Sequence, residues 1–312
     1  MIIQPACSLS SPVTEFFIIA GATAVGKSDL AGAVAEHCGG EIVSADAFQI
    51  YRGLDLLTAK PSAELLARAP HHLIGEIPLT RSFDVAQYLV AAREHIVEIR
   101  ARGKVPIITG GTGLYLRALT HGLAEMPRAD ASIRAELEKQ PLAELQRQLA
   151  QLDPVGAAQI DLKNPRRVIR AIEVCHLTGL PFSSFRQEWA ATPTGIRGIV
   201  LTMNREALNA RIDRRTETMF AAGVVEEVRS SGEIGFTASQ TIGLREIRAL
   251  LAGQLSQPDC IATIQQTTRR YAKRQMTWFR REPALESVDL SQTADLGRLA
   301  ESLAQRAAQS MP

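Results

Sequence analysis

The sequence lacks paired cysteines, a strong charge of one sign, and any apolar run long enough to cross a membrane. Its 312 residues include four cysteines that lie far apart and never form a Cys-x-x-Cys pair. This spacing argues against a zinc site or a disulfide framework and suits a reducing compartment. The formal net charge is only +2, so any nucleic-acid surface must come from local clusters of Lys and Arg.

The early apolar run, Phe16 to Ala20, is too short to span a bilayer, and no Lys or Arg lies among the first 26 residues. We therefore expect neither a signal peptide nor membrane contact, and a cytoplasmic protein. The adjacent His71 and His72 have no Cys or carboxylate at ligand spacing, which disfavours a metal site there. Heptads and repeats are absent as well, so the expected state is a monomer.

Strand-like and helical patterns alternate along much of the chain. Short apolar runs predict strands at 16–20, 41–45, 105–109 and 198–202, and helical spacing predicts helices over 27–38 and 84–101. Strands that alternate with helices predict an α/β fold with a doubly wound, mainly parallel sheet.

One stretch in the middle of the chain has a different character. Between His121 and Arg197 strand-like runs vanish, and Leu, Ala, Arg, Glu and Gln dominate. We expect a core made of residues 1–121 and 198–312, with a helical insert domain at 122–197. Within that core, the first fifteen residues are expected to form a loose arm, and the chain after the last strand to be mostly helical.

The strongest local motif follows the first predicted strand. Eight residues fit the pattern G-x-x-x-x-G-K-[ST], namely Gly21, Ala22, Thr23, Ala24, Val25, Gly26, Lys27 and Ser28. Glycines let backbone N–H groups turn toward one anion, and the following helix adds its positive end. Lys27 supplies a charge, and the Ser28 hydroxyl can ligate Mg²⁺. The motif predicts a P-loop NTPase-like core that binds phosphate, without deciding whether the ligand is a nucleoside triphosphate such as ATP.

Two further segments belong to the same predicted sheet edge. Asp46 follows the second strand, at the carboxyl edge where open α/β sheets bind ligands, and Gln49 lies nearby. The carboxylate could act as a base, hold Mg²⁺ as in kinases, or merely form a turn. Gly110 to Gly113 follow the third strand, and Thr112 among them offers a hydroxyl. This stretch could contact a substrate or be only a tight turn.

Basic residues gather in three places on this nearly neutral chain. The run from Thr267 to Arg281 carries six cations and no acid, and smaller clusters lie at 166–170 and 211–215. Together they indicate a groove for nucleic acid or a polyphosphate. Trp278 and Phe279, which interrupt the first cluster, are more typical of a core than of a stacking platform.

Taken in order, these segments resemble the tRNA dimethylallyltransferase (tRNA isopentenyltransferase) family. The matching pieces are GATAVGKS (21–28), IVSADAFQIYRGLD (42–55), TAKP (58–61), PHHL (70–73), GGTGLYLRAL (110–119), NPRRVIRAIEV (164–174), RIDRRTETMFAAGVVEEV (211–228), TIGLREI (241–247) and AKRQMTWFR (272–280). They cover most of residues 16–281, and the ordered set is far more specific than the phosphate-binding motif alone.

The resemblance implies transfer of a dimethylallyl group from dimethylallyl diphosphate to N6 of adenine 37 in the tRNA anticodon stem-loop, with Mg²⁺. It implies Asp46 as general base, Thr112 beside the transferred group, and Arg215 as a second diphosphate contact. It also implies an insert that covers the substrate channel. The residues it implies for tRNA binding are Asp46, Ala47, Phe48, Gln49, Arg134, Arg166, Arg167, Arg170, Gln240, Gly243, Arg245, Lys273, Arg274, Gln275, Thr277, Trp278 and Arg280.

The sequence departs from the family pattern at several points. Ala47 stands where the family usually has Ser, Leu57 replaces a Gly, Val25 a Ser or Gly, Asn164 an Asp, and Leu244 an aromatic residue. None of these changes removes the implied base, the cradle or Arg215, so they bear on fine contacts rather than on the reaction class.

Two other enzymes share parts of this pattern. A small-molecule P-loop kinase would use Asp46 to hold Mg²⁺ but leaves the basic run at 267–281 unexplained. An adenylate isopentenyltransferase would prenylate free AMP, whereas the long insert and basic helix favour a macromolecular acceptor.

Overall fold

A computed structural model describes residues 15–123, 126–127, 129–185, 196–282, 284–293 and 295–309. The expected loose arm therefore lies almost wholly outside the described residues. By their contacts, the described residues form two compact units, a smaller one within 121–192 and a larger one from the rest.

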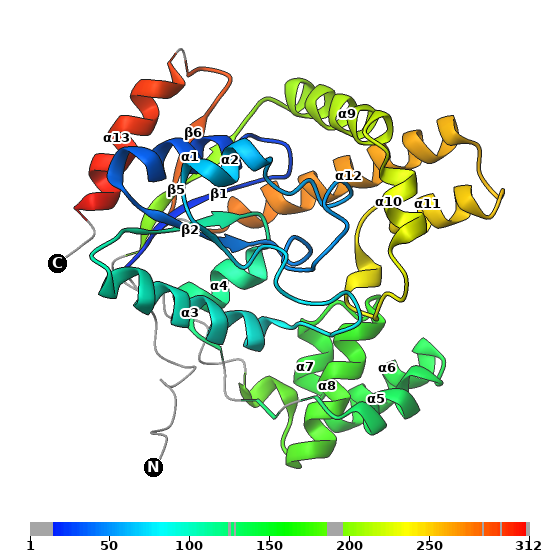
Figure 1. The fold of residues 1–312 in the computed structure, drawn as a ribbon. Helices are drawn as coiled ribbons and strands as arrows, with labels where there is room; N and C mark the ends of the chain where they lie inside the picture. Colours follow the sequence, from blue (N-terminus) through cyan, green and yellow to red (C-terminus); the bar gives the residue numbers. More distant parts are fainter. Residues whose placement is uncertain are drawn as a thin grey trace, which may run out of the picture. The chain divides into compact units, whose positions relative to one another are not determined.

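The larger unit is built on one six-stranded parallel sheet (Figure 1). The strands are β1 (Phe17–Gly21), β2 (Glu41–Ala45), β3 (His71–His72), β4 (Pro106–Gly110), β5 (Arg197–Thr202) and β6 (Glu286–Asp289), in the order β3-β2-β4-β1-β5-β6. Every residue of β1, β2 and β4 is buried, as expected for strands covered on both faces. The predicted α/β class with a doubly wound parallel sheet is confirmed.

Helices of the larger unit pack on both faces of this sheet, with α1 and α13 on one face and α3 and α4 on the other (Figure 1). The described helices of this unit are α1 (Lys27–Cys38), α2 (Ala63–Arg68), α3 (Val85–Ala101), α4 (Gly113–His121), α9 (Arg205–Ala221), α10 (Val224–Ser230), α11 (Leu244–Leu251), α12 (Gln257–Phe279) and α13 (Leu296–Ala308), with a short 3₁₀ turn at Ala238–Gln240. The α3 helix starts with a capping box, in which the Asp84 carboxylate accepts from the Gln87 N–H and the Gln87 side chain accepts from the Asp84 N–H.

Two edge strands were not predicted from the sequence. The β6 strand consists of the half-polar segment ESVD, which pairs with β5 through the register Val200↔Ser287. The β3 strand has only His71 and His72, which pair with β2. Both strands lie at sheet edges, and neither carries the continuous apolar run by which the central strands were recognised. The C-terminal part is otherwise helical, as expected.

The smaller unit, described by itself, is helical. It contains α5 (Ala131–Glu138), α6 (Leu142–Leu152), α7 (Pro154–Gln159) and α8 (Pro165–Thr178). Leu145, Leu149, Val168 and Ile172 form the centre of its apolar core. The Asp153 carboxylate caps α7 by accepting from the Gly156 N–H at 2.8 Å, and it also accepts from the Ser183 N–H and hydroxyl.

Candidate active site

The predicted cradle forms where β1 turns into α1. Gly21 has φ 152°, and a Cβ there would lie 2.7 Å from the Leu201 carbonyl oxygen, so only glycine fits against β5. At the other end of the loop, Gly26 has φ 105° and Ala24 has φ 63°, both in the left-handed region. The loop leads directly into the N-terminus of α1. The first backbone N–H groups of a helix have no acceptor within the helix, so they favour a bound anion.

Lys27 is held inside this loop. Its ammonium donates to the Ala22 carbonyl at 2.7 Å. Burial lowers the pKa of Lys27 to about 8, although the Asp46 carboxylate acts in the opposite direction and Arg215 adds to the lowering. A bound anion would stabilise the charged ammonium, so the pocket is suited to a negatively charged ligand.

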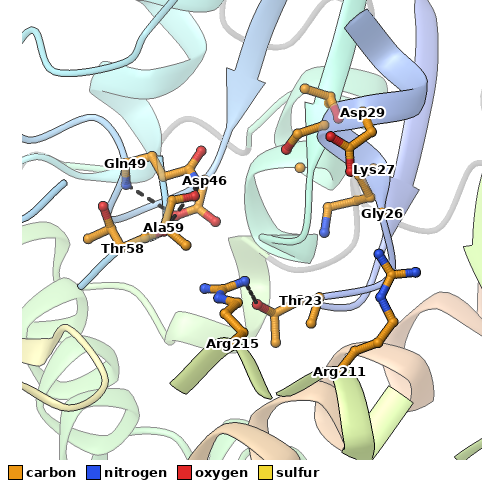
Figure 2. Close-up of a pocket in the computed structure, with 14 residues that line it drawn as sticks. Thr23, Gly26, Lys27, Asp29, Asp46, Gln49, Thr58, Ala59, Arg211 and Arg215 are labelled. Carbon is orange, nitrogen blue, oxygen red and sulfur yellow. Dashed lines mark hydrogen bonds between the residues drawn. The ribbon is translucent and has the colours of Figure 1, made fainter. Parts of the chain in front are cut away.

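Two arginines of α9, one helical turn apart, approach the same loop. The Arg215 guanidinium donates to the Thr23 hydroxyl at 3.1 Å (Figure 2). The guanidinium of Arg211 lies 3.5 Å from the Val25 carbonyl oxygen. Burial lowers the pKa of Arg215, although Asp46 opposes this effect. Arg215 thus lies at the cradle, while its contact with a diphosphate stays a prediction. The sequence places Arg211 only in a basic cluster. Its spacing of four residues from Arg215 on one helix could have indicated that both side chains face the cradle.

Asp46 lies at the carboxyl end of β2, and its Oδ1 accepts from the backbone N–H groups of Phe48, at 2.9 Å, and Gln49, at 3.2 Å. The Thr112 hydroxyl accepts from the Ala47 N–H at 3.1 Å, and the Thr112 N–H donates to the Ala45 carbonyl. The structure therefore brings the turns after β2 and β4 together, as the sequence predicted. The bonds from the Phe48 and Gln49 N–H groups also fix the orientation of the Asp46 carboxylate.

Glycines at the end of β4 and the start of α4 permit this close approach. A Cβ on Gly110 would lie 2.2 Å from the Ala45 carbonyl oxygen, and one on Gly113 would lie 2.4 Å from the Trp278 ring. Trp278 is half-buried against this turn. The run is thus a structural turn, whether or not it also contacts a substrate.

Gln275 of α12 connects the two loops. Its side-chain amide donates to the Gly111 carbonyl at 2.8 Å and accepts from the Thr23 N–H at 2.9 Å. The residue is 6% exposed. Gln275 and Trp278 thus have well-defined packing roles in the site, while their contact with tRNA stays a prediction.

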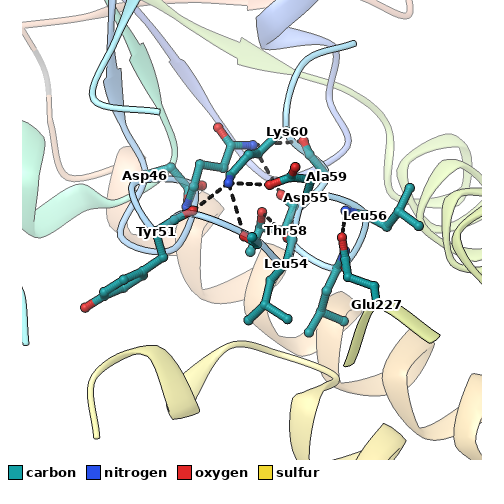
Figure 3. A network of polar contacts seen from close by, with 12 residues as sticks. Asp46, Tyr51, Leu54, Asp55, Leu56, Thr58, Ala59, Lys60 and Glu227 are labelled. Carbon is teal, nitrogen blue, oxygen red and sulfur yellow. Dashed lines mark hydrogen bonds and ion pairs between the residues drawn. The ribbon is translucent and has the colours of Figure 1, made fainter. Parts of the chain in front are cut away.

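Most of the TAKP segment, Thr58 to Lys60, belongs to a loop, residues 54–60, that is held by side chains from several directions (Figure 3). The Lys60 ammonium donates to the Tyr51 and Gly53 carbonyls and pairs with the Asp55 carboxylate. The Glu227 carboxylate of α10 accepts from the N–H groups of two successive residues, Leu56 and Leu57. Lys60 therefore anchors the loop rather than offering a free cation to a ligand.

These elements enclose a polar pocket at the carboxyl edge of the sheet (Figure 2). It is lined by Thr23, Ala24, Gly26, Lys27, Ser28, Asp29, Asp46, Gln49, Thr58, Ala59, Thr109, Gly110, Arg211 and Arg215. An apolar recess adjoins it and shares Thr23, Asp46 and Arg215 with it. One end of this combined cavity suits phosphate and the other suits hydrocarbon.

Oxygen donors for a divalent cation are present in the polar pocket. The Ser28 hydroxyl and the carboxylates of Asp29 and Asp46 all line it, and oxygen is the ligand atom that Mg²⁺ prefers. This donor set fits Mg²⁺ that arrives with a diphosphate. No cluster of three or more His, Cys, Asp or Glu residues arranged for a metal occurs among the described residues. His72 instead pairs with Glu41, at 2.7 Å.

The residues predicted to bind tRNA fall in several places. In the smaller unit, Arg134 and Arg170 both pair with the buried Glu173, while Arg166 and Arg167 are exposed at the start of α8. In the larger unit, Gln240, Arg245, Lys273, Arg274, Thr277 and Arg280 are exposed, and Gly243 is buried at φ 92°. The basic run on α12 is not free of acidic partners, because Arg269 pairs with Asp213 of α9.

Known proteins of one family are similar to this chain over most of its length. A model of the IPP transferase family matches residues 49–282. The tRNA dimethylallyltransferase of Geobacter sulfurreducens is 45% identical over 286 residues, which cover 88% of this chain and 92% of the relative. That of Myxococcus xanthus is 44% identical over 275 residues, covering 85% and 89%.

The chain belongs to the tRNA dimethylallyltransferase family.

Solved structures of tRNA dimethylallyltransferases and isopentenyltransferases have the same fold. A tRNA isopentenylpyrophosphate transferase from Bacillus halodurans superposes with a TM-score of 0.69 at 35% identity, covering 96% of this chain and 98% of that one. A eukaryotic dimethylallyltransferase described as acting on tRNA gives a TM-score of 0.80 at 25% identity, covering 95% and 80%. The family predicted from the ordered motifs is confirmed.

The departures from the family pattern can now be placed. Val25 is buried in the main core, and Leu57 and Leu244 are buried in a second apolar cluster beside α10 and α11. Ala47 keeps its backbone bond to Thr112 without a side-chain hydroxyl, and the Asn164 side chain still caps α8 by accepting from the Arg166 N–H.

None of the described helices combines the length and the hydropathy that a membrane-spanning helix requires.

Proposed function

We propose that this protein transfers a dimethylallyl group from dimethylallyl diphosphate to N6 of adenine 37 in tRNA and releases diphosphate. The observation that carries this proposal is the arrangement of one pocket. Asp46 lies in it beside the cations Lys27, Arg211 and Arg215, and an apolar recess opens next to them. This arrangement suits a base, an anionic leaving group and a hydrocarbon group held together.

The chemistry follows from the residues. The exocyclic amine of adenine is a weak nucleophile, because its lone pair is delocalised into the ring. As N6 forms a bond to C1 of the donor, Asp46 accepts a proton from that amine. The C1–O bond breaks at the same time, and its electron pair leaves with the diphosphate. Lys27, Arg211 and Arg215 stabilise the charge that develops there.

The cradle orients the leaving group. Backbone N–H groups at the start of α1 point at the diphosphate, and the Thr23 hydroxyl keeps Arg215 directed toward it. Mg²⁺ bound through Ser28 would neutralise further charge on the diphosphate.

The acceptor is proposed to be the anticodon stem-loop, from which the adenine is splayed out to reach Asp46. Exposed cations on α12 and at its C-terminal end, among them Lys273, Arg274 and Arg280, would contact its phosphates. We further propose that the enzyme acts in the cytoplasm, as a monomer. The relatives' names and the tRNA-acting structural neighbour support the choice of tRNA over a free nucleotide.

The test is transfer of radiolabel from dimethylallyl diphosphate, with Mg²⁺, to an unmodified tRNA transcript that has adenine at position 37. AMP and ATP are offered in parallel as acceptors. Label on the transcript supports the proposal. Label on AMP alone would identify a cytokinin-forming enzyme, and ATP hydrolysis without transfer would identify a kinase-like reaction.

A further inference from the structure

The apolar recess beside the polar pocket has one wall supplied by a loop rather than by a helix. Its apolar lining comes from Phe48, Leu57, Ile212, Met219, Ile242 and Ile264. Of these, Leu57 belongs to the 54–60 loop, and the two residues that follow it, Thr58 and Ala59, line the polar pocket. The same loop therefore borders both the phosphate end and the hydrocarbon end of the cavity.

An allylic diphosphate has the same two ends. If its diphosphate lies against Lys27 and Arg215, its C1 atom lies near Asp46, which both parts of the cavity share. The hydrocarbon chain then enters the apolar recess, because burial of apolar surface away from water is favourable. A longer donor adds its extra carbon atoms at the far end of that chain.

Leu57 is fixed in place at this recess. It is 4% exposed, and its N–H donates to the Glu227 carboxylate at 2.9 Å. Its Cδ1 and that of Ile264 both press on Gly243, where an added Cβ would meet them at 3.0 and 3.3 Å. The Leu57 side chain packs in the apolar cluster beside α10 and α11, and Lys60 anchors its loop. Leu57 therefore cannot easily move aside for a longer ligand.

We propose that the Leu57 side chain sets the upper limit on the length of the prenyl donor, excluding chains longer than dimethylallyl. One further isoprene unit needs about the space that this side chain fills. The inference rests on the proposed function, since it concerns which donor the same site accepts.

The test compares dimethylallyl and geranyl diphosphate as donors to the same tRNA transcript, for the wild-type protein and for Leu57→Ala. We expect the wild type to prefer the dimethylallyl donor and Leu57→Ala to shift the ratio of the two kcat/KM values toward geranyl by about tenfold or more. In parallel, geranyl diphosphate is measured as a competitive inhibitor of dimethylallyl transfer. Its inhibition constant should fall by a similar factor in the variant.

Leu56→Ala is the matched control, because Leu56 precedes Leu57, bonds to the same carboxylate and does not line the recess. It should leave the donor ratio unchanged. If Leu57→Ala is poorly folded, Leu57→Met, which keeps the volume but adds flexibility, should still lower the inhibition constant of geranyl diphosphate.

The outcomes are separable. A folded Leu57→Ala protein with an unchanged donor ratio would overturn the inference and leave the proposed function standing. A changed KM for tRNA with an unchanged donor ratio would also overturn it, by assigning the recess to the acceptor base. Failure of the wild type to transfer any prenyl group would instead contradict the proposed function.

Discussion

Two groups of buried charge, one in each unit of the molecule, differ in what neutralises them. In the polar pocket, Lys27 and Arg215 donate to a carbonyl and a hydroxyl, and burial lowers the pKa of each. In the smaller unit, Arg134 and Arg170 donate to the carboxylate of Glu173, whose side chain is fully buried.

The difference separates a binding site from a structural ion pair. Among the described residues, no carboxylate forms an ion pair with Lys27 or Arg215, whose hydrogen bonds go to a carbonyl and a hydroxyl. An anionic ligand would therefore supply the missing negative charge. The negative charge of Glu173 is already compensated by Arg134 and Arg170. Burial would raise the pKa of Glu173, but hydrogen bonds from Arg170 and Arg134 outweigh that effect and leave the pKa below its ordinary value. Changes in the pocket should therefore affect catalysis, and changes at Glu173 should affect stability.

The largest effect is expected for Asp46→Asn. Asn keeps an oxygen that can accept from the Phe48 and Gln49 N–H groups, so the loop should stay in place. It cannot take the proton from the adenine amine, and kcat should fall by roughly 10²–10⁴. Single-turnover transfer to tRNA measures this, with dimethylallyl diphosphate affinity measured on the same sample. Retention of most of the turnover would remove Asp46 from the role of base.

Glu173→Gln should mainly destabilise the smaller unit. Breaking a buried ion pair leaves uncompensated charge, and we expect a cost of about 3 kcal/mol, the low end of the usual range, because the Arg134 side chain is 41% exposed. Hydrogen exchange of α5 and α8 amides reports this loss. Glu136→Gln is the control in the same unit, since Glu136 pairs with Lys139 only at the surface and its loss should matter little.

The sign of the pH effect at Glu173 follows from its lowered pKa. Its stabilising contribution is present above the pKa of an unfolded glutamate and is lost as the pH falls through the lower, folded value. The α5 and α8 amides of the wild type should therefore lose protection in acid, and Glu173→Gln should lose less. Equal acid sensitivity in both proteins would show that Glu173 is not the group that titrates.

Diphosphate affinity should depend on pH through Lys27. The pKa of Lys27 is about 8 in the free pocket, and a bound anion raises it. Below that pH the ammonium is already charged. Above it, binding must take up a proton, so affinity should fall by up to about tenfold per pH unit. Calorimetry with inorganic diphosphate in buffers of different ionisation enthalpy measures the proton uptake. Lys27→Arg, which stays charged, should remove it.

The smallest effect is expected for Thr23→Val. This near-isosteric change removes the hydroxyl that orients Arg215 but keeps the Thr23 N–H bond to Gln275. A hydrogen bond of this kind contributes about 1 kcal/mol, so KM for the donor should rise roughly fivefold. Steady-state kinetics at saturating tRNA measures it. An unchanged KM would mean that Arg215 is oriented by other contacts.

The sequence predicted the local features of the site well, because each rests on a short pattern. Three features follow from apolar runs that end at polar or glycine residues: the cradle at 21–28, the α1 helix from Lys27 to Cys38, and the approach of the turn after β2 to Thr112. Such runs locate the carboxyl edge of a parallel sheet without any knowledge of distant contacts.

Features that depend on distant contacts were not predicted. Gln275 reaches across 252 positions to Thr23 and 164 positions to Gly111, and nothing in the local pattern distinguishes it from an exposed glutamine on a basic helix. Three other features also depend on contacts between distant parts of the chain. They are the approach of Arg211 to the cradle, the bonds from the Leu56 and Leu57 N–H groups to Glu227, and the polar edge strand β6. Their partners become neighbours only when the chain folds.

The most direct test of the proposed function is nucleoside analysis of tRNA labelled by the purified protein. Two transcripts are compared, one with adenine and one with guanine at position 37, each with labelled dimethylallyl diphosphate and Mg²⁺. We expect label only in N6-dimethylallyladenosine released from the adenine transcript. Equal label in the guanine transcript, or label confined to added AMP, would contradict it.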